Sequence, residues 1–200
     1  MKIFYRIFCF AKNNNVLDIV RKVIFYIFCH NGFNNFYRLK SIYYLKSFNV
    51  ILGRNVTFLG LSNKIEFGKN IRIYPNCIWE SSANAKIKIG NNFVFSYGCL
   101  FSITKEIEIG DNVMIGEYSS IRDTSHSYND TEKPFMNQED ISVKIIIGNN
   151  VWVGRGVLIL PGAFIEDNVI VAANSLVKGH LYTNSIYGGN PCRFIKKIHP

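Results

Sequence analysis

The chain has 200 residues, 48% of them apolar, which is enough for one domain with a continuous core. Its formal net charge is +9 at pH 7, but the basic residues gather before residue 50 and after residue 177 without any nucleic-acid-binding motif, so we expect no nucleic-acid partner. No stretch has the ~20 apolar residues of a membrane-spanning helix, and Arg6 interrupts the apolar opening segment, so we expect neither a membrane span nor a cleaved signal peptide.

Residues 1–50 are predicted to form a helical cap. Apolar side chains recur at helical spacing in residues 16–30 and again in 33–47, between Lys and Arg residues, which indicates two amphipathic helices. Helices here would cover the open first edge of a β-sheet scaffold. Their basic and aromatic faces also suit peripheral contact with the inner face of the cytoplasmic membrane, in addition to capping.

After residue 51 an apolar residue recurs in six-residue steps, with a few short insertions and one long one. A helix repeats at about 3.6 residues and a strand at two, so a period of six indicates a short strand and a corner, repeated. Three residues after each of these apolar residues stands Asn or Gly, which tolerate positive φ. Only Leu61 and Tyr118 break this rule. The predicted corner residues are Asn55, Asn70, Asn76, Asn92, Gly98, Asn112, Asn150, Gly156, Gly162, Asn168 and Asn174.

This pattern resembles the hexapeptide repeat of the left-handed parallel β-helix, in which three hexads make one triangular coil of roughly eighteen residues. We therefore predict an all-β repeat over residues 51–182, with a loop insertion at 122–146 and a short tail at 183–200. The same residues as ordinary buried strands of an α/β domain would leave the register of Asn and Gly to chance.

The five cysteines are scattered, without the close pairs of a zinc site or a disulfide scaffold. Cys77 and Cys99 fall at the position after the corner, where a small side chain is usual. We expect a reduced, cytoplasmic protein.

The insertion is polar, contains Pro134 and begins just before His126. Long insertions into a regular scaffold are usually functional or disordered. In the tail, Gly188, Gly189 and Pro191 predict a tight reversal that is followed by basic residues.

Three segments together carry a family resemblance: IRDTSH, IIIGNNVWVGRGVLILPGAFIEDNVIVAANSLVKG and IYGGNPCRFIKKI. They resemble the hexapeptide-repeat O-acetyltransferases, which transfer acetyl from acetyl-coenzyme A to sugar hydroxyls, and are most similar to those of lipopolysaccharide and capsule modification. The resemblance implies acetyl-coenzyme A as co-substrate, a saccharide acceptor, direct attack in a ternary complex and no metal. We also expect a homotrimer with sites between subunits, because the predicted base and cofactor groove lie on different faces of one coil.

His126 is the predicted general base, since an unactivated sugar hydroxyl is a poor nucleophile and an imidazole suits proton transfer near neutral pH. Asp123 is either the carboxylate that orients His126 or a plain turn residue. The family pattern often has a second histidine where Thr124 stands, so the orienting group is open, and Glu139 and Asp140 are weaker candidates.

Trp152 occupies an outward position, where a large apolar side chain lacks a structural reason. It either lines an acceptor and thioester tunnel, as the resemblance implies, or packs against a neighbouring subunit. The resemblance also implies cofactor contacts at small and basic positions, among them the backbone N–H of Arg155 as a donor to the thioester carbonyl. These positions are Gly154, Arg155, Ala172, Ala173, Ser175, Lys178, Arg193 and Lys196.

Other functions fit the same scaffold. An acetyltransferase for a small acceptor, such as a simple glycoside, a drug or an amino sugar, is the alternative within the enzymes, and a non-catalytic scaffold is the alternative outside them. A zinc carbonic anhydrase would require three converging histidines, and of the four in the chain only His126 is placed between coils.

Overall fold

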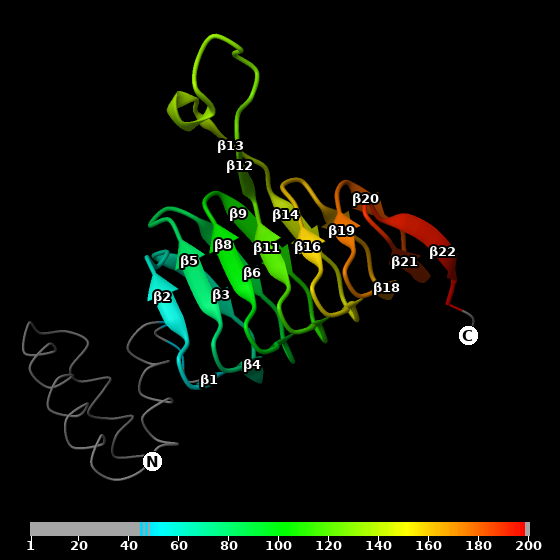
Figure 1. Ribbon diagram of the computed structural model, residues 1–200. Coiled ribbons are helices and arrows are strands. Elements are labelled where there is room, and N and C mark those ends of the chain that lie inside the picture. The colour runs from blue at the N-terminus through cyan, green and yellow to red at the C-terminus, as the bar shows by residue number, and fades with distance from the viewer. Residues whose placement is uncertain (1–44, 46, 48, 199–200) are drawn as a thin grey trace, which may run out of the picture.

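The computed structural model describes residues 45, 47 and 49–198, and residues 50–188 wind into a three-sided β-solenoid (Figure 1). The helices predicted at 16–30 and 33–47 lie outside the described residues, except for Leu45 and Ser47. Within the described part of the chain, no helix has the length and apolar character needed to cross a membrane.

Three parallel sheets form the sides of the prism in residues 50–188, and a final antiparallel strand extends the first of them. Sheet A contains β1 (Val50–Leu52), β4 (Ile71–Ile73), β7 (Val94–Phe95), β10 (Met114–Ile115), β15 (Trp152–Val153), β18 (Val169–Val171), β21 (Ser185–Gly188) and the antiparallel β22 (Arg193–Lys197). Sheet B contains β2 (Thr57–Leu59), β5 (Ile78–Ser81), β8 (Leu100–Ile103), β11 (Ser120–Arg122), β16 (Leu158–Ile159) and β19 (Leu176–Val177). Sheet C contains β3 (Lys64–Phe67), β6 (Lys86–Ile89), β9 (Glu106–Ile109), β14 (Ile145–Ile147), β17 (Phe164–Ile165) and β20 (His180–Leu181).

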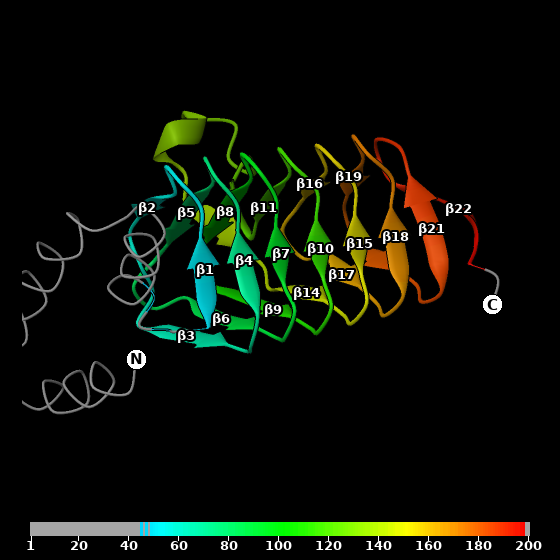
Figure 2. The same cartoon turned by 90° about the horizontal axis from the view of Figure 1, so that it is seen from below.

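Each coil lies directly on the one before it, so residues at equivalent positions form columns along the solenoid (Figure 2). Met114, for example, pairs with Val94 on one side and Trp152 on the other. The inward column of the same strands, with Phe95, Ile115 and Val153, is fully buried. The core is therefore a continuous apolar stack along the axis, and each coil buries its apolar residues against its neighbours.

The corners have the predicted backbone conformation. All eleven predicted corner Asn and Gly residues have positive φ, between 52° and 77°. Tyr118, which breaks the sequence rule, also has positive φ, of 60°, and its ring lies over Gly98, where a Cβ would come within 2.7 Å of it. Near Leu61 the left-handed conformation falls one residue earlier, at Gly60.

Asparagines form a ladder along the corner between sheets C and A. The side-chain amide of Asn70 donates to Asn92 at 3.0 Å, and that of Asn92 donates to Asn112 at 2.8 Å. The ladder satisfies the polar side chains and ties successive coils together, so asparagine has a structural advantage here that glycine lacks.

The three outer faces of the solenoid differ in character. Sheets A and B carry exposed apolar side chains, among them Ile51, Met114 and Trp152 on sheet A and Leu59, Ile78 and Leu158 on sheet B. The outward residues of the first half of sheet C are charged instead: Lys64, Glu66, Lys86, Lys88, Glu106 and Glu108. Sheets A and B therefore expose more apolar surface than the first half of sheet C does.

The insertion projects from the corner between sheets B and C, well away from the prism (Figure 1). It contains a two-stranded antiparallel ladder of β12 (Thr124–His126) and β13 (Asp140–Ser142), and a short 3-10 helix at Phe135–Asn137. Cys77 and Cys99 are buried at their corners, in the small position that their spacing predicted.

Candidate active site

His126 lies at the end of β12, at the base of the projecting insertion. Its ladder partner is Asp140 at the start of β13, and His126 Nδ1 lies 2.6 Å from Asp140 Oδ1. Both side chains are exposed, by 75% for His126 and 50% for Asp140. The backbone pairing thus brings a histidine and a carboxylate from either end of the insertion into contact, and His126 Nε2 makes no hydrogen bond within the described residues.

Asp123 does not orient His126, which corrects the first of the two roles considered for it. Its carboxylate is fully buried and accepts hydrogen bonds from the backbone N–H groups of Thr104, Lys105 and Glu106, at 2.7 to 2.9 Å. The Thr124 hydroxyl donates to the same carboxylate. Asp123 therefore fixes the corner of the preceding coil, in the place where the insertion leaves the prism.

A cavity of about 530 Å³ lies beside His126 on the outer side of sheet B. Its wall includes four residues that line up across neighbouring strands, Leu59, Glu80, Ser102 and Arg122. Thr124, Ser125, His126 and Asp140 close the side toward the insertion. The predicted base thus opens onto a space of polar and charged side chains that is large enough for a small-molecule site.

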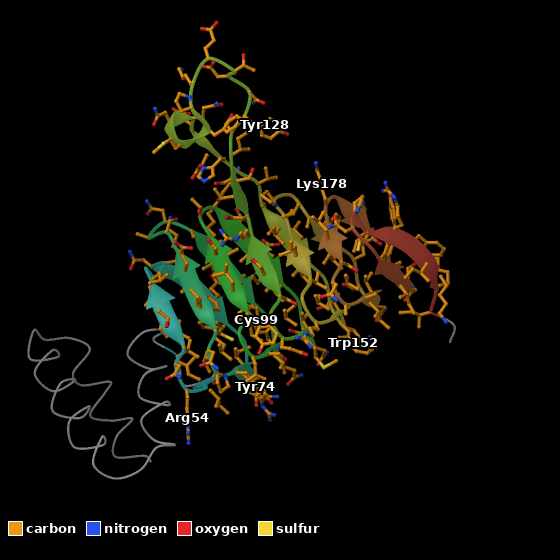
Figure 3. The ribbon with its side chains drawn as sticks, in the orientation of Figure 1. Arg54, Tyr74, Cys99, Tyr128, Trp152 and Lys178 are labelled. Carbon is orange, nitrogen blue, oxygen red and sulfur yellow. The ribbon has the colours of Figure 1, made fainter. Side chains whose placement is uncertain are left out.

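Trp152 lies on a different face from His126. It is 52% exposed on sheet A, and with Met114 and Ile170 it lines a separate hollow of about 580 Å³. Figure 3 shows Trp152 on one side of the prism and the insertion, marked by Tyr128, on the other. Within one chain the structure does not bring these two predicted site residues together.

Most predicted cofactor positions meet at the corner between sheets A and B. Gly154, Arg155, Ala172, Ala173 and Ser175 all fall on the two consecutive turns after β15 and β18. A Cβ on Gly154 would come within 2.7 Å of the Ala173 nitrogen, so close stacking of the coils already requires glycine there. Ser175 is buried, and its hydroxyl accepts from the Gly189 N–H.

The long side chain of Arg155 folds back along the corner. Its guanidinium lies 5.3 Å from the centre of the Tyr118 ring, and its Nε lies 3.9 Å from a Glu117 carboxylate oxygen. A guanidinium over an aromatic face is an attractive arrangement. The side chain therefore lies toward the preceding coil rather than over the small residues Ala172 and Ala173 of the next one.

The predicted basic residues divide between two places. Arg193 and Lys196 lie on β22, opposite Gly188 and Ile186 at the C-terminal end of sheet A. Lys178 instead follows β19 at the corner between sheets B and C, on the side of the insertion (Figure 3). Arg193 pairs with Gly188, and a Cβ on Gly188 would come within 3.1 Å of the Ala172 Cβ, so Arg193 lies close to the corner between sheets A and B. Lys178 lies on a different corner.

Sequence reasoning did not single out Glu80, Ser102 and Arg122, and it ranked Asp140 below Asp123. Glu80, Ser102 and Arg122 share the outward position of consecutive coils, and this column is the signal that would have found them. No group of three His, Cys, Asp or Glu side chains among the described residues is placed to hold a metal ion.

Comparison with known proteins identifies the family. Residues 144–179 match the model of the bacterial transferase hexapeptide (six repeats). The chain is 34% identical over 132 residues to the galactoside O-acetyltransferase of Escherichia coli (strain K12), a match that covers 66% of this chain and 63% of the relative. It is 30% identical over 144 residues to WbbJ of the same strain, provisionally named a lipopolysaccharide biosynthesis O-acetyl transferase, with 68% of this chain and 72% of the relative covered.

This chain belongs to the hexapeptide-repeat acetyltransferase family. The structure of a galactoside acetyltransferase in complex with coenzyme A is similar, with a TM-score of 0.57 at 25% identity, covering 94% of this chain and 84% of the other. The chain spans less than two thirds of the length of the galactoside O-acetyltransferase from Escherichia coli. Family membership confirms the hexapeptide repeat. The same repeat forms the coils that carry His126 and the corner with Gly154, Ala172 and Ala173.

Proposed function

We propose that this protein is an acetyl-coenzyme A-dependent O-acetyltransferase that acetylates a hydroxyl of a sugar-containing acceptor. The observation that carries the proposal is the pair of His126 and Asp140 beside a polar cavity, in a chain of the hexapeptide-repeat acetyltransferase family. Acetyl-coenzyme A supplies the activated thioester. The protein's own task is then to bind the acceptor, remove its proton and keep the two reactants in position.

His126 is the general base in this proposal. An Nδ1–H that donates to Asp140 leaves Nε2 as the acceptor for the proton of the sugar hydroxyl. The Asp140 carboxylate holds the ring in this tautomer and stabilises the imidazolium that forms, as the orienting carboxylate does in other acyl transferases. Trp152 and the backbone N–H of Arg155 are proposed to contact the acetyl thioester from the other side.

A site between subunits follows from the placement of His126 and Trp152. The two lie on different faces of one chain, yet β15 with Trp152 belongs to the coil directly after the one that leads into His126. Rotation of a chain about an axis parallel to the solenoid turns its faces but leaves the height of each residue along that axis unchanged. Sheet A of one chain would therefore place its Trp152 within one coil spacing, ~4.8 Å, of the height of His126 on the neighbouring chain. We therefore propose a homotrimer in which the apolar faces of sheets A and B meet.

The residues present fit coenzyme A at the corner between sheets A and B. Small side chains at Gly154, Ala172 and Ala173 leave room for a narrow chain, and Arg193 and Lys196 provide positive charge for phosphates at the adjoining end of sheet A. Ser175 is proposed to support this corner through Gly189 rather than by direct contact, since its side chain is buried. Lys178 is proposed to reach the cofactor only on a neighbouring subunit.

For the acceptor, the comparisons favour a small glycoside over a surface saccharide. Galactosides are named for a 34% identical relative and for a structural neighbour, whereas lipopolysaccharide is named for one relative at 30% identity. The match to WbbJ covers more of that relative, 72%, which keeps a surface saccharide or its precursor as the second candidate. A cytoplasmic location and peripheral membrane contact through residues 1–50 stay predictions.

We also infer that the coil is left-handed. This is supported by Figures 1 and 2 together, in which the chain turns counter-clockwise as it recedes from its N-terminal end. The same hand was expected from the hexapeptide resemblance.

Two measurements test the proposed function. Calorimetry should detect binding of acetyl-coenzyme A, and absence of binding would leave the non-catalytic scaffold as the better explanation. Mass spectrometry of products, with simple glycosides, nucleotide sugars and surface polysaccharides as acceptors, should then show one added acetyl group per sugar. Product from the polysaccharides alone would reverse the order of the two candidate acceptors.

A further inference from the structure

Arg122 lies in the same cavity as His126 but has no role in the chemistry described above. It is the last residue of β11, its side chain is exposed, and it lines the cavity together with Thr124, Ser125 and His126. Its position in the sequence is four residues before the proposed base. Arg122 and the proposed base therefore line the same cavity.

The charge of Arg122 is not neutralised by the protein. Its side chain makes no ion pair or hydrogen bond within the described residues. The carboxylates in or beside the cavity wall have other partners: Asp123 accepts from three backbone N–H groups, Asp140 lies 2.6 Å from His126 Nδ1, and Glu80 accepts from the Ser102 hydroxyl at 2.8 Å. A guanidinium in a cavity that has no ion pair within the described residues is available for an external anion.

The opposite end of the cavity differs in character. Glu80 and Ser102 stand in the same outward column as Arg122, on the two strands before it. Neighbouring strands are about 4.8 Å apart, so about 10 Å separates the backbone positions of Glu80 and Arg122, which is comparable to one or two sugar rings. The cavity thus has a hydrogen-bond acceptor end for neutral hydroxyls and a cationic end.

We propose that Arg122 binds an anionic group of the acceptor, a carboxylate or a phosphate, and that the acceptor is therefore an acidic saccharide. A guanidinium presents five N–H donors in a planar fork that matches either group. The proposal rests on the proposed function, since it names the class of acceptor for the same site. Carboxylate in a uronic acid and phosphate in a sugar phosphate are two sources of the same chemistry.

The test compares small galactose derivatives with and without an anionic group. Methyl galactoside is the neutral acceptor, methyl galacturonoside carries a carboxylate in place of the C6 hydroxymethyl group, and galactose 1-phosphate carries a phosphate in place of the methyl group and keeps the C6 hydroxyl. We expect wild-type kcat/KM to be about 10- to 100-fold higher for at least one anionic acceptor, the usual effect of a hydrogen bond to a charged group. Arg122→Gln should remove this preference and leave both the neutral acceptor and the KM for acetyl-coenzyme A unchanged. Arg122→Lys should keep part of it.

Lys88→Gln is the matched control, since it removes a cation from the outer face of sheet C. Equal wild-type rates for neutral and anionic acceptors would overturn the proposal, and so would an Arg122→Gln variant that loses activity on all three acceptors alike. Saturation-transfer NMR with the same three sugars, without acetyl-coenzyme A, gives a readout independent of turnover. Anionic sugars that bind to the wild-type protein but not to the Arg122→Gln variant support the proposal even if no acetyl is transferred, a result that would reject only the proposed function.

Discussion

His126 Nδ1 and Asp140 Oδ1 are 2.6 Å apart, and the same two residues are opposite partners in the β12–β13 ladder. The backbone therefore sets the distance between the proposed base and its carboxylate, although fourteen positions separate them in the sequence. The insertion interrupts the regular coil only to return the chain to the same point, which places the pair at the mouth of the cavity.

Asp140→Asn should lower kcat for acetyl transfer about tenfold or more, because the neutral amide stabilises the imidazolium less than a carboxylate does. The KM for acetyl-coenzyme A should not change, since the proposed cofactor positions lie mainly on another corner. Glu139→Gln is the control: it removes the neighbouring carboxylate, which makes no hydrogen bond or ion pair with His126 in the described part of the chain. Steady-state kinetics on the three proteins decide the matter, and equal losses in both variants would show that only the charge of the loop matters.

Subunit mixing tests the site between chains. Trimers of His126→Ala alone and of Trp152→Ala alone should both have low activity. If each site takes His126 from one chain and Trp152 from the next, random mixed trimers should recover about a quarter of the wild-type activity. A site is intact only when its first chain is the Trp152→Ala variant and its second chain is the His126→Ala variant. The chains are mixed in denaturant, refolded and assayed. Activity no higher than the mean of the two parents would place both residues in the same subunit's site, or Trp152 outside it.

Much of the fold could be predicted because the corner chemistry is local. A positive φ favours Asn or Gly at one position, whatever the rest of the chain does, so Asn92 or Gly156 reports its own backbone conformation. The partner of His126 could not be predicted in this way. Asp140 lies in the insertion, which has no repeat. The carboxylate of Asp123, which is closer in sequence, instead accepts hydrogen bonds from the N–H groups of the preceding coil.

The placement of Trp152 was predictable only in part. Its outward direction follows from the repeat, but its separation from His126 depends on which side of the prism each hexad occupies. Because the insertion between Ile121 and Ile147 interrupts the hexads, the sequence does not show which side of the prism the hexads after it occupy. The role of Arg122 was not predicted because a single outward arginine forms no sequence pattern. Its neighbours in the cavity become evident only from the strand pairing of sheet B.

The asparagine ladder gives a prediction about stability. Asn92→Ala loses the hydrogen bonds to both neighbours and keeps a Cβ at a φ of 56°, without the short polar side chain that lets asparagine adopt this conformation. Asn92→Gly loses the same hydrogen bonds without the conformational strain. The alanine variant should therefore be less stable than the glycine variant by about 1 kcal/mol. Urea unfolding of the three proteins measures the difference, and equal stability of the two variants would contradict the account of the corner.

The cluster around Lys144 predicts a dependence of stability on pH. Lys144 Nζ lies 2.9 Å from Glu106 and 2.8 Å from Glu108, and its hydrogen bond lowers the pKa of the Glu106 carboxyl below its usual value. A carboxyl with a lowered pKa in the folded state contributes stability above its unfolded pKa, and loses it as the pH falls through the folded value. Lys144→Met should therefore melt below wild type at pH 7, and the gap should close toward pH 3.

Lys133→Met is the control for this series, because Lys133 pairs with Asp130 within the projecting insertion, away from the coils. Its melting temperature should follow wild type at each pH. A Lys144→Met variant with the same deficit at pH 3 as at pH 7 would show that the lysine contributes through packing rather than through charge.

The proposed base is tested most directly by the rate of acetyl transfer to an accepted sugar by His126→Ala, measured by mass spectrometry of the acetylated product. We expect a fall of roughly 10² to 10⁴, the usual range for loss of a general base. Binding of acetyl-coenzyme A and trimer assembly should stay close to wild type, because neither the cofactor corner nor the apolar faces of sheets A and B include His126. A His126→Ala protein that transfers acetyl at a near-normal rate would contradict the account.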